Sequence, residues 1–448
     1  MDAEMSSGTE MTMSWLRALA LSTMAVASLT VLSHADDEKA TKQLEKLDVQ
    51  FVKALTELAK AYDDKKVPEA AHFFASCALG FGGKDEKLAL IKGGWEGAVY
   101  LGKLRGGDPI KETAPITSAL GSLSTAYKKI LDPWIARARK NDLSESLRKA
   151  MLDTGVKYEL CRGAHEYVQA VQRFNVLRKA MGLRAILWDY EVSRELIQVA
   201  WYTCESEDWQ YKELKKDSAF YSGHVPEKKF GSGGPFKLSE LPEAMRSFVL
   251  ARQQILNPNA RTLRLAHWVG GSAIEYFSLY GIPQLPYRED IPTPTQRFRT
   301  ETLVKDWVDV EETIKIGDKL VPYVRYPYPS ESDAPTVYAT GRGATEIGWA
   351  ESENAFRDHA GLPIMLRVFC DAKISAVDAT LSDSSGKEVP CRLYITGDPR
   401  VELDKAWATL IMFPTSPLRG MSQYKVTIKC KLDETPFESS WTFKTRPN

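Results

Sequence analysis

The stretch "FNVLRKAMGLRAILWDYEVSRELIQVA", Phe174 to Ala200, predicts a compact unit of two helices joined by a turn and a short extended segment. Leu177 and Met181 follow Phe174 at helical spacing and form one apolar face. Gly182 comes directly after this face and can take the left-handed backbone conformation that ends many helices. We therefore predict that the first helix stops at this glycine.

The second half of the stretch predicts an extended segment and a new helix. Ile186 and Leu187 are adjacent apolar residues, as expected of a short buried strand. Asp189 can cap the next helix, and Glu191 lies in its first turn, where a negative charge is favourable. These features belong to architecture, so the stretch indicates a fold rather than a reaction. The buried stripe of the second helix is expected to consist of Val192, Leu196, Val199 and Ala200.

The composition is that of a globular protein with more than one domain. The chain has 448 residues, of which 44% are hydrophobic and 26% are charged. A chain of this length predicts two or three domains. The formal net charge is zero, which argues against a strongly basic face, so we predict no nucleic-acid partner.

The N-terminus predicts an export signal. An apolar run ends at Ser33-His34-Ala35 and is followed by charged residues, which indicates a signal peptide over residues 1–35 and a mature chain that begins near Asp36. The protein is then expected to be secreted or to lie in the periplasm or cell envelope, with no integral membrane span after signal removal. An uncleaved membrane anchor is the alternative.

The mature chain divides into three domains and a linker by pattern. Residues 37–165 are predicted to form an all-α domain, in which His72 is interpreted as a packed or half-exposed helical histidine. Residues 166–282 contain the opening stretch, and the prolines of residues 283–321 predict a linker. Residues 322–448 alternate apolar and polar side chains in short runs, which predicts an all-β, immunoglobulin-like or fibronectin-like sandwich.

Two features of the β region lead to specific expectations. "VDATLSDSSGKEVPCRLYI" predicts a hairpin that turns at Ser384-Ser385-Gly386, with Val389, Cys391, Leu393 and Ile395 facing inward. Cys370 and Cys430 fall on the apolar faces of an early and a late strand. An exported protein can form disulfides, so they are the preferred pair. Buried free thiols are the alternative.

The middle region resembles a known family. The phrase N-x-x-R-x-x-x-G-L-x-x-x-x-W-D-x-x-x-S, here Asn175 to Ser193, resembles the opening of the CAP superfamily of SCP-like extracellular domains. Residues 244–281 and the segment "AFYSGHVPEKKF" are similar to later parts of bacterial members. The resemblance implies an α-β-α sandwich with a cleft, in which two histidines and two acidic residues can bind a divalent metal.

The metal site implied by the family is degenerate in this sequence. The first family histidine corresponds to His224, but Ala251 stands where the second is expected. Glu240 or Glu243 are candidate acidic residues, and His267 is another candidate ligand nearby. A surface-loop His224 and a packed strand His267 are the alternatives. No cofactor is therefore expected, and a metal such as zinc is expected only if the site is rearranged.

The sequence favours a binding protein over an enzyme. We expect an exported, non-catalytic interaction protein that binds an extracellular or envelope ligand. Trp201, Tyr202 and Trp209 are candidate groove residues, although aromatic residues at such spacings are more often core. A metal-assisted hydrolase built on His224, with Glu240 or Glu243 and His267, is one alternative, and a lipid- or sterol-binding protein is another.

Overall fold

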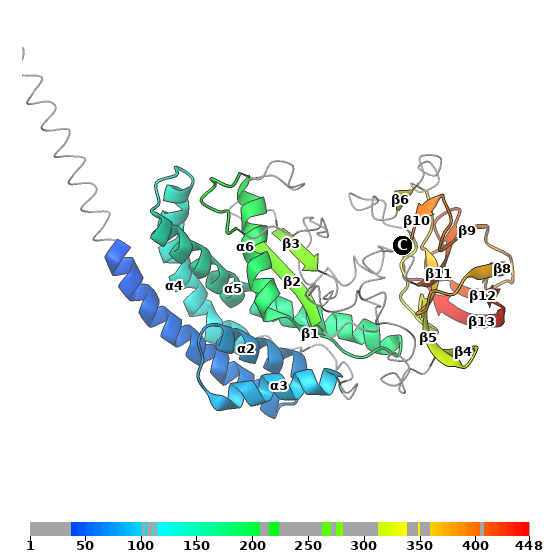
Figure 1. Cartoon of the computed structure of the whole chain (residues 1–448), viewed down its shortest axis with the longest axis horizontal. Helices are drawn as coiled ribbons and strands as arrows, with labels where there is room; N and C mark the ends of the chain where they lie inside the picture. The colour runs from blue at the N-terminus through cyan, green and yellow to red at the C-terminus, as the bar shows by residue number, and fades with distance from the viewer. Residues whose placement is uncertain are drawn as a thin grey trace, which may run out of the picture.

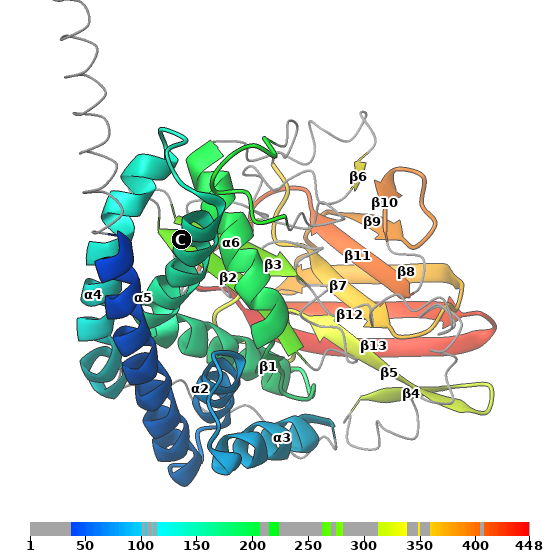
Figure 2. The same ribbon diagram turned by 60° about the vertical axis from the view of Figure 1, so that its left-hand side comes forward.

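The computed structural model shows a helical N-terminal region followed by a region of antiparallel sheets (Figure 1 and Figure 2). It describes residues 37–100, 104, 110, 114–206, 215–223, 262–269, 275–280, 312–337, 348–349, 359–403 and 407–447. The predicted signal peptide lies outside these residues. Within the part that is described, no helix has both the length and the apolar character needed to cross a membrane.

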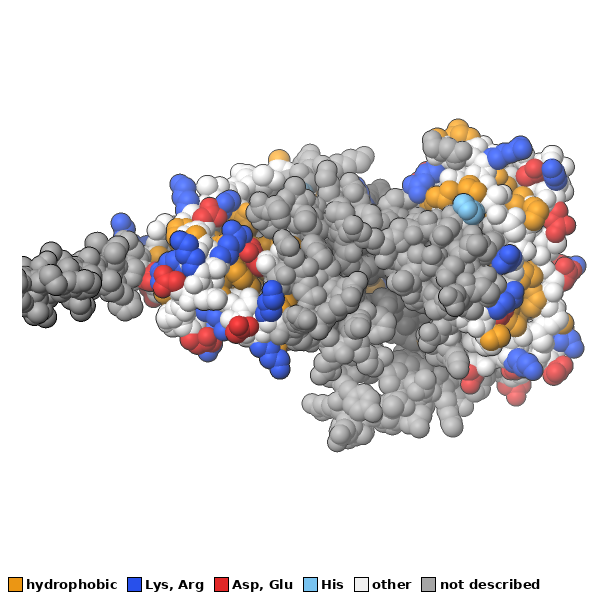
Figure 3. All heavy atoms as spheres, turned by 90° about the horizontal axis from the view of Figure 1, so that it is seen from above, with side chains coloured by type: hydrophobic (Ala, Val, Ile, Leu, Met, Phe, Trp, Pro, Cys, Tyr) orange, Lys and Arg blue, Asp and Glu red, His pale blue; other side chains and the backbone are white. Residues whose placement is uncertain are grey.

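On the face of the molecule drawn in Figure 3, the described residues carry charges of both signs. Figure 3 shows Lys and Arg side chains interspersed with Asp and Glu side chains over the helical region and over the sheet region. This distribution agrees with the formal net charge of zero.

Helix α2 forms the centre of the helical region. Its side chains are buried from Pro68 to Ala78, and it contacts α3, α5, α6 and strand β1. Phe73 of α2 packs against the rings of Tyr167 and Trp188, with ring centroids 5.9 and 4.6 Å away. The helices span residues 37–64 (the first helix), α2 Pro68–Gly80, α3 Glu86–Tyr100, α4 Ala114–Ala138, α5 Glu145–Ala180 and α6 Tyr190–Ser206.

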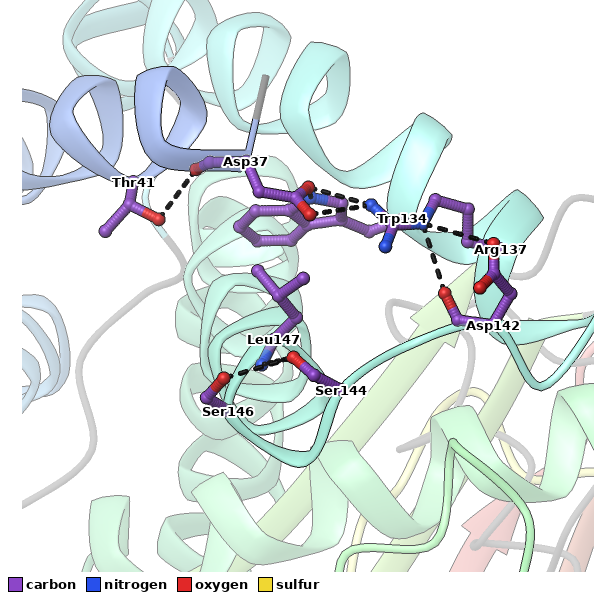
Figure 4. Close-up of polar contacts among 8 residues, drawn as sticks. All are labelled: Asp37, Thr41, Trp134, Arg137, Asp142, Ser144, Ser146 and Leu147. Atoms are coloured by element: carbon purple, nitrogen blue, oxygen red, sulfur yellow. Dashed lines mark hydrogen bonds and ion pairs between the residues drawn. The ribbon is translucent and has the colours of Figure 1, made fainter. Parts of the chain in front are cut away.

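The first helix is fastened to the end of α4 by a buried carboxylate (Figure 4). Asp37 is 8% exposed, and its two carboxylate oxygens accept hydrogen bonds from Arg137 at 2.8 and 2.9 Å. Trp134 Nε1 donates to the same carboxylate at 3.3 Å. Nearby, Ser144 caps α5 by accepting a hydrogen bond from the backbone N–H of Leu147.

We expect Asp37→Asn to destabilise the protein by about 1–3 kcal/mol, because it weakens a charge-assisted pair that is largely removed from water. Urea unfolding followed by circular dichroism measures the change. Glu38→Gln is the matched control, since Glu38 pairs with Lys42 on the solvent face and its side chain is 69% exposed. Equal unfolding midpoints for the two variants would show that the Asp37 contact adds nothing.

The predicted turn at Gly182 is confirmed. Gly182 has φ 71°, in the left-handed region. Its N–H donates to Lys179 O at 3.0 Å, and the N–H of Leu183 donates to Arg178 O at 2.8 Å. This pair of bonds is the Schellman motif, which satisfies carbonyls left open at the end of α5.

A small sheet lies against the helices. It has the strand order β1-β2-β3, built from β1 Leu187–Trp188, β2 Thr262–Val269 and β3 Glu275–Tyr280. β1 pairs with β2 in parallel, and β2 pairs with β3 antiparallel. α6 contacts β2 and β3, while α2 contacts β1 and α5 contacts β2. The predicted domain boundary at residues 165 and 166 falls inside α5, so this helix belongs to both the helical bundle and the layer around the sheet.

The C-terminal region contains two main antiparallel sheets. One is five-stranded, in the order β4-β5-β7-β11-β9, and one is three-stranded, in the order β13-β12-β8, with a separate pair β10-β6. The last part of the predicted linker forms a strand from Thr313 onward. There the half-buried Ile314 and Ile316 alternate with exposed residues, and a turn follows at Gly317. The bounds are β4 Thr313–Ile316, β5 Lys319–Tyr326, β6 Gly348–Trp349, β7 Ile364–Val368, β8 Ile374–Asp383, β9 Cys391–Ile395, β10 Val401–Glu402, β11 Ala408–Pro414, β12 Gln423–Leu432 and β13 Thr435–Lys444.

The predicted hairpin over β8 and β9 is wrong beyond its tip. The turn closes with hydrogen bonds from Asp383 N to Lys387 O and from Val389 N to Leu381 O. The arms then separate, and β8 pairs with β12 while β9 pairs with β11. Pro390 lies where they diverge and has no N–H to extend the ladder. The most buried side chain of β9 is Tyr394, not one of the predicted inward set.

All six cysteines are free thiols, including the expected pair Cys370 and Cys430. Cys370 follows β7 of the five-stranded sheet, whereas Cys430 lies in β12 of the three-stranded sheet opposite Phe437. The alternation that placed Cys430 on an apolar face is present, since it is 6% exposed. Burial raises the pKa of the Cys430 thiol to about 11, so it is a protonated thiol at neutral pH.

Candidate functional site

The residues of the predicted metal site fall mostly outside the described part of the chain. His224, Glu240, Glu243 and the aromatic Trp209 all lie there. The backbone of His267 is in β2, where it pairs with Phe277 as expected of a strand residue. Among the described residues, no group of three or more His, Cys, Asp or Glu side chains could hold a metal ion.

The two candidate groove aromatics that are described belong to the core. Trp201 is fully buried and stacks on Trp268, with ring centroids 4.2 Å apart and planes at 15°. Tyr202 is also buried, and its hydroxyl accepts a hydrogen bond from the backbone N–H of Lys215 at 2.9 Å. Both side chains are therefore used in packing α6 against its neighbours.

The first half of the family-like motif fastens α5 to the segment before β1. Asn175 is fully buried, and its side-chain oxygen accepts from Ile186 N at 2.7 Å. Its amide nitrogen donates to Ile186 O at 2.9 Å and to Glu69 of α2 at 2.7 Å. Arg178, one turn later, donates to Arg184 O at 2.7 Å. Asn175 thus joins α5, α2 and the chain entering the sheet.

The second half of the motif fastens α6 to β2. Trp188 Nε1 donates to Leu265 O at 3.1 Å, and the hydroxyl of Ser193 accepts from Leu265 N at 3.0 Å. The N–H of Asp189 donates to Leu263 O at 2.9 Å, and its carbonyl accepts from Ser193 N, which places it at the cap position before α6. The side chains of Trp188 and Ser193 bind backbone groups of β2, so these contacts stabilise the fold.

A buried histidine connects α2 to α3. His72 is 2% exposed, and its Nε2 lies 3.1 Å from the carboxylate of Glu96 and 3.4 Å from the hydroxyl of Ser76. Burial lowers the pKa of His72, although Glu96 opposes the shift. The hydrogen bond from His72, together with Lys92, lowers the pKa of Glu96 to about 2. At neutral pH a neutral imidazole therefore donates its Nε2–H to an ionised carboxylate.

The fold should lose stability as the pH falls below 6.5. His72 has a lowered pKa in the folded state, so the unfolded chain binds its proton first, and the loss begins below the ordinary value of 6.5. Glu96 adds a further loss between pH 4.5 and about 2. His72→Gln should remove the part of the loss just below pH 6.5, because Gln can still donate to Glu96 but does not titrate. Urea midpoints at about pH 7.5 and about pH 5.5 measure this. A wild-type midpoint that does not fall over this range would contradict it.

A solvent-open hollow lies between the first helix and α3. It has a volume of about 350 Å³ and is here named the α3 hollow. Leu90 on its rim is 74% exposed, while Ile91 on its floor is 4% exposed. α3 lies beside α2 at the outer edge of the helical region in both ribbon views (Figure 1 and Figure 2). The lining residues are Asp63, Lys87, Leu90, Ile91, Gly94, Trp95 and Ala98.

The α3 hollow was not predicted from the sequence, yet α3 carries a signal of it. Gly93, Gly94 and Gly97 lie inside this helix, where each glycine costs roughly 0.5–1 kcal/mol relative to alanine. A Cβ atom added at any of the three would have no neighbour within 4 Å. The packing of the described residues therefore does not require these glycines, and they leave the helix surface open beside Trp95.

Comparison with known proteins gives no relative. No family model, no curated protein and no solved structure matches the chain.

Proposed function

We propose that this chain is an exported, non-catalytic binding protein that recognises a ligand outside the cell or in the cell envelope. It combines a helical N-terminal part, a CAP-like middle unit with a degenerate metal site, and an immunoglobulin-like β-sandwich. No resident metal or cofactor is part of the proposal.

The arrangement around the small sheet supports the CAP-like part of the proposal. The chain order is helix α5, strand β1, helix α6 and then the strands β2 and β3. The residues of the family-like phrase, Asn175, Trp188 and Ser193, hold this order together through buried contacts to backbone atoms. The degeneracy of the metal site rests on the sequence alone, where Ala251 replaces the second histidine.

The observation that carries the binding function is the α3 hollow. Pockets of about 300–1,000 Å³ with apolar walls and a few polar groups are typical of ligand sites, and the α3 hollow is at the small end of this range. Leu90 lines the hollow and keeps 74% of its surface exposed, so its side chain is accessible to a ligand that enters there.

Retention of the mature chain by envelope material tests the proposed function. A tagged chain of residues 36–448 is incubated with isolated envelope fractions, and the bound fraction is measured for the wild type, Leu90→Glu and Val49→Glu. Val49 is a matched control, since it is 70% exposed on the first helix and does not line the α3 hollow. We expect Leu90→Glu to abolish retention and Val49→Glu to leave it unchanged. Absence of retention by the wild type, or equal retention by both variants, would overturn the proposal.

A further inference from the structure

The α3 hollow contains a carboxylate that forms no ion pair with a described Lys or Arg side chain. Asp63 accepts a hydrogen bond from Trp95 Nε1 at 3.2 Å and makes no ion pair with any described residue. The other acidic groups nearby are paired, Asp64 with Lys87 at 3.7 Å and Asp85 with Lys60. Among the described residues that line the α3 hollow, the charge without an ion-pair partner is therefore negative.

The walls around this carboxylate are apolar and aromatic. Trp95 lines the hollow beside Asp63, and its indole N–H is already used by the carboxylate. An indole ring attracts cations through its quadrupole, and this attraction adds to that of a neighbouring carboxylate. Leu90, Ile91 and Ala98 add aliphatic surface to the lining.

We propose that the α3 hollow binds a small alkylammonium compound, with its cationic head at Asp63 and Trp95 and its alkyl part against Leu90 and Ile91. The inference rests on the proposed binding function and names the ligand class. An anion is disfavoured, because Lys87, the cation among the described lining residues, is already next to Asp64. A volume of about 350 Å³ suits a compact cation with a short alkyl chain.

Gly94 provides the space that this ligand needs. It lines the hollow, and a Cβ atom at this position would meet no protein atom within 4 Å. Gly94→Leu should therefore fold at least as well as the wild type, because leucine has a higher helix propensity than glycine. Its side chain would occupy the hollow and exclude the ligand, so this variant separates binding from folding.

Binding of butyltrimethylammonium by the mature chain tests the inference, with butanesulfonate as the probe of opposite charge. Isothermal titration calorimetry is done on the wild type, Asp63→Asn, Gly94→Leu and the matched control Glu38→Gln, whose native side chain is 69% exposed and does not line the hollow. We expect saturable binding of the cation only. Asp63→Asn should weaken it at least tenfold, Gly94→Leu should abolish it, and Glu38→Gln should change it less than twofold. Thermal unfolding checks that each variant is folded.

If butyltrimethylammonium does bind, two results would still overturn the inference. One is equal binding of butyltrimethylammonium and butanesulfonate, and the other is unchanged cation binding in both Asp63→Asn and Gly94→Leu. If the cation does not bind while Leu90→Glu still abolishes envelope retention, the ligand class is wrong and the binding function stands. If the cation does not bind and the wild type is not retained, both proposals fail.

Discussion

Asn175→Ala is expected to destabilise the protein by about 3–5 kcal/mol, a large part of the stability of an ordinary domain. The substitution removes three buried hydrogen bonds at once, two to the backbone of Ile186 and one to Glu69. It leaves a backbone N–H, a backbone C=O and a carboxylate oxygen without these partners. Burial already raises the pKa of Glu69, because a buried carboxylate is costly to keep charged. Loss of the hydrogen bond from Asn175 would make the charged form of Glu69 less favourable still.

Chemical unfolding of the purified protein measures this effect. Val176→Ala is the matched control, because Val176 is the next residue of the same helix and its side chain is 40% exposed. The control should stay within about 0.5 kcal/mol of the wild type. A loss below about 1 kcal/mol in Asn175→Ala would mean that the joint between α5 and the segment before β1 contributes little to stability.

Gly155→Ala is the second variant with a large expected effect, about 3 kcal/mol of destabilisation. A methyl group at this position of α5 would overlap the indole of Trp201. Trp201 cannot move freely, because it is fully buried and stacked on Trp268. Relief of the overlap requires either that both indoles shift or that α5 moves away from α6.

The same substitution at another helix glycine should have the opposite sign. A Cβ atom at Gly121 in α4 would have nothing within 4 Å, so Gly121→Ala should stabilise by about 0.5–1 kcal/mol. Thermal unfolding of Gly155→Ala and Gly121→Ala, with near-ultraviolet circular dichroism as a probe of the tryptophans, measures both. Equal shifts in the two variants would show that only helix propensity matters and that the Trp201 contact does not.

Local features of the opening stretch could be predicted from the sequence because they depend on neighbouring residues. Gly182 ends α5 through its own positive φ and hydrogen bonds to residues of the last turn. Asp189 precedes α6 because its backbone carbonyl accepts the first helical bond. Turn and cap chemistry of this kind acts over four or five residues.

The reach of α5 could not be predicted in the same way. The sequence pattern placed a boundary at residue 165, but the helix continues to Ala180 with buried side chains along much of its length. Helical periodicity shows that a face is buried and does not show which neighbours cover it. The role of Asn175 could not be predicted either, because its partner Glu69 is 106 positions away in the sequence.

The β region shows the limit of alternation as a guide. The expected apolar face of Cys430 is confirmed, because Cys430 lies with Tyr424, Val426 and Ile428 on the buried face of β12. Alternation does not specify which strand lies next to which. For this reason it assigned β8 and β9 to one hairpin, and it favoured a disulfide between Cys370, which follows a strand of one sheet, and Cys430, which lies in the other sheet.

The α3 hollow could not be predicted from the sequence, because two helices that pack side by side form it together. Asp63 belongs to the first helix and the other lining residues belong to α3. The glycines of α3 are visible in the sequence, but only the structure shows that the space beside them is open.

The central structural claim is that the helical bundle and the small sheet form one cooperative unit, joined at Asn175. Native-state hydrogen exchange tests it most directly. The amide of Ile186 is bound by Asn175, and that of Leu265 by Ser193. We predict that both exchange with the same opening free energy as amides in the middle of α2, through global unfolding. Exchange of Ile186 and Leu265 at a much lower free energy, with α2 still protected, would contradict the claim.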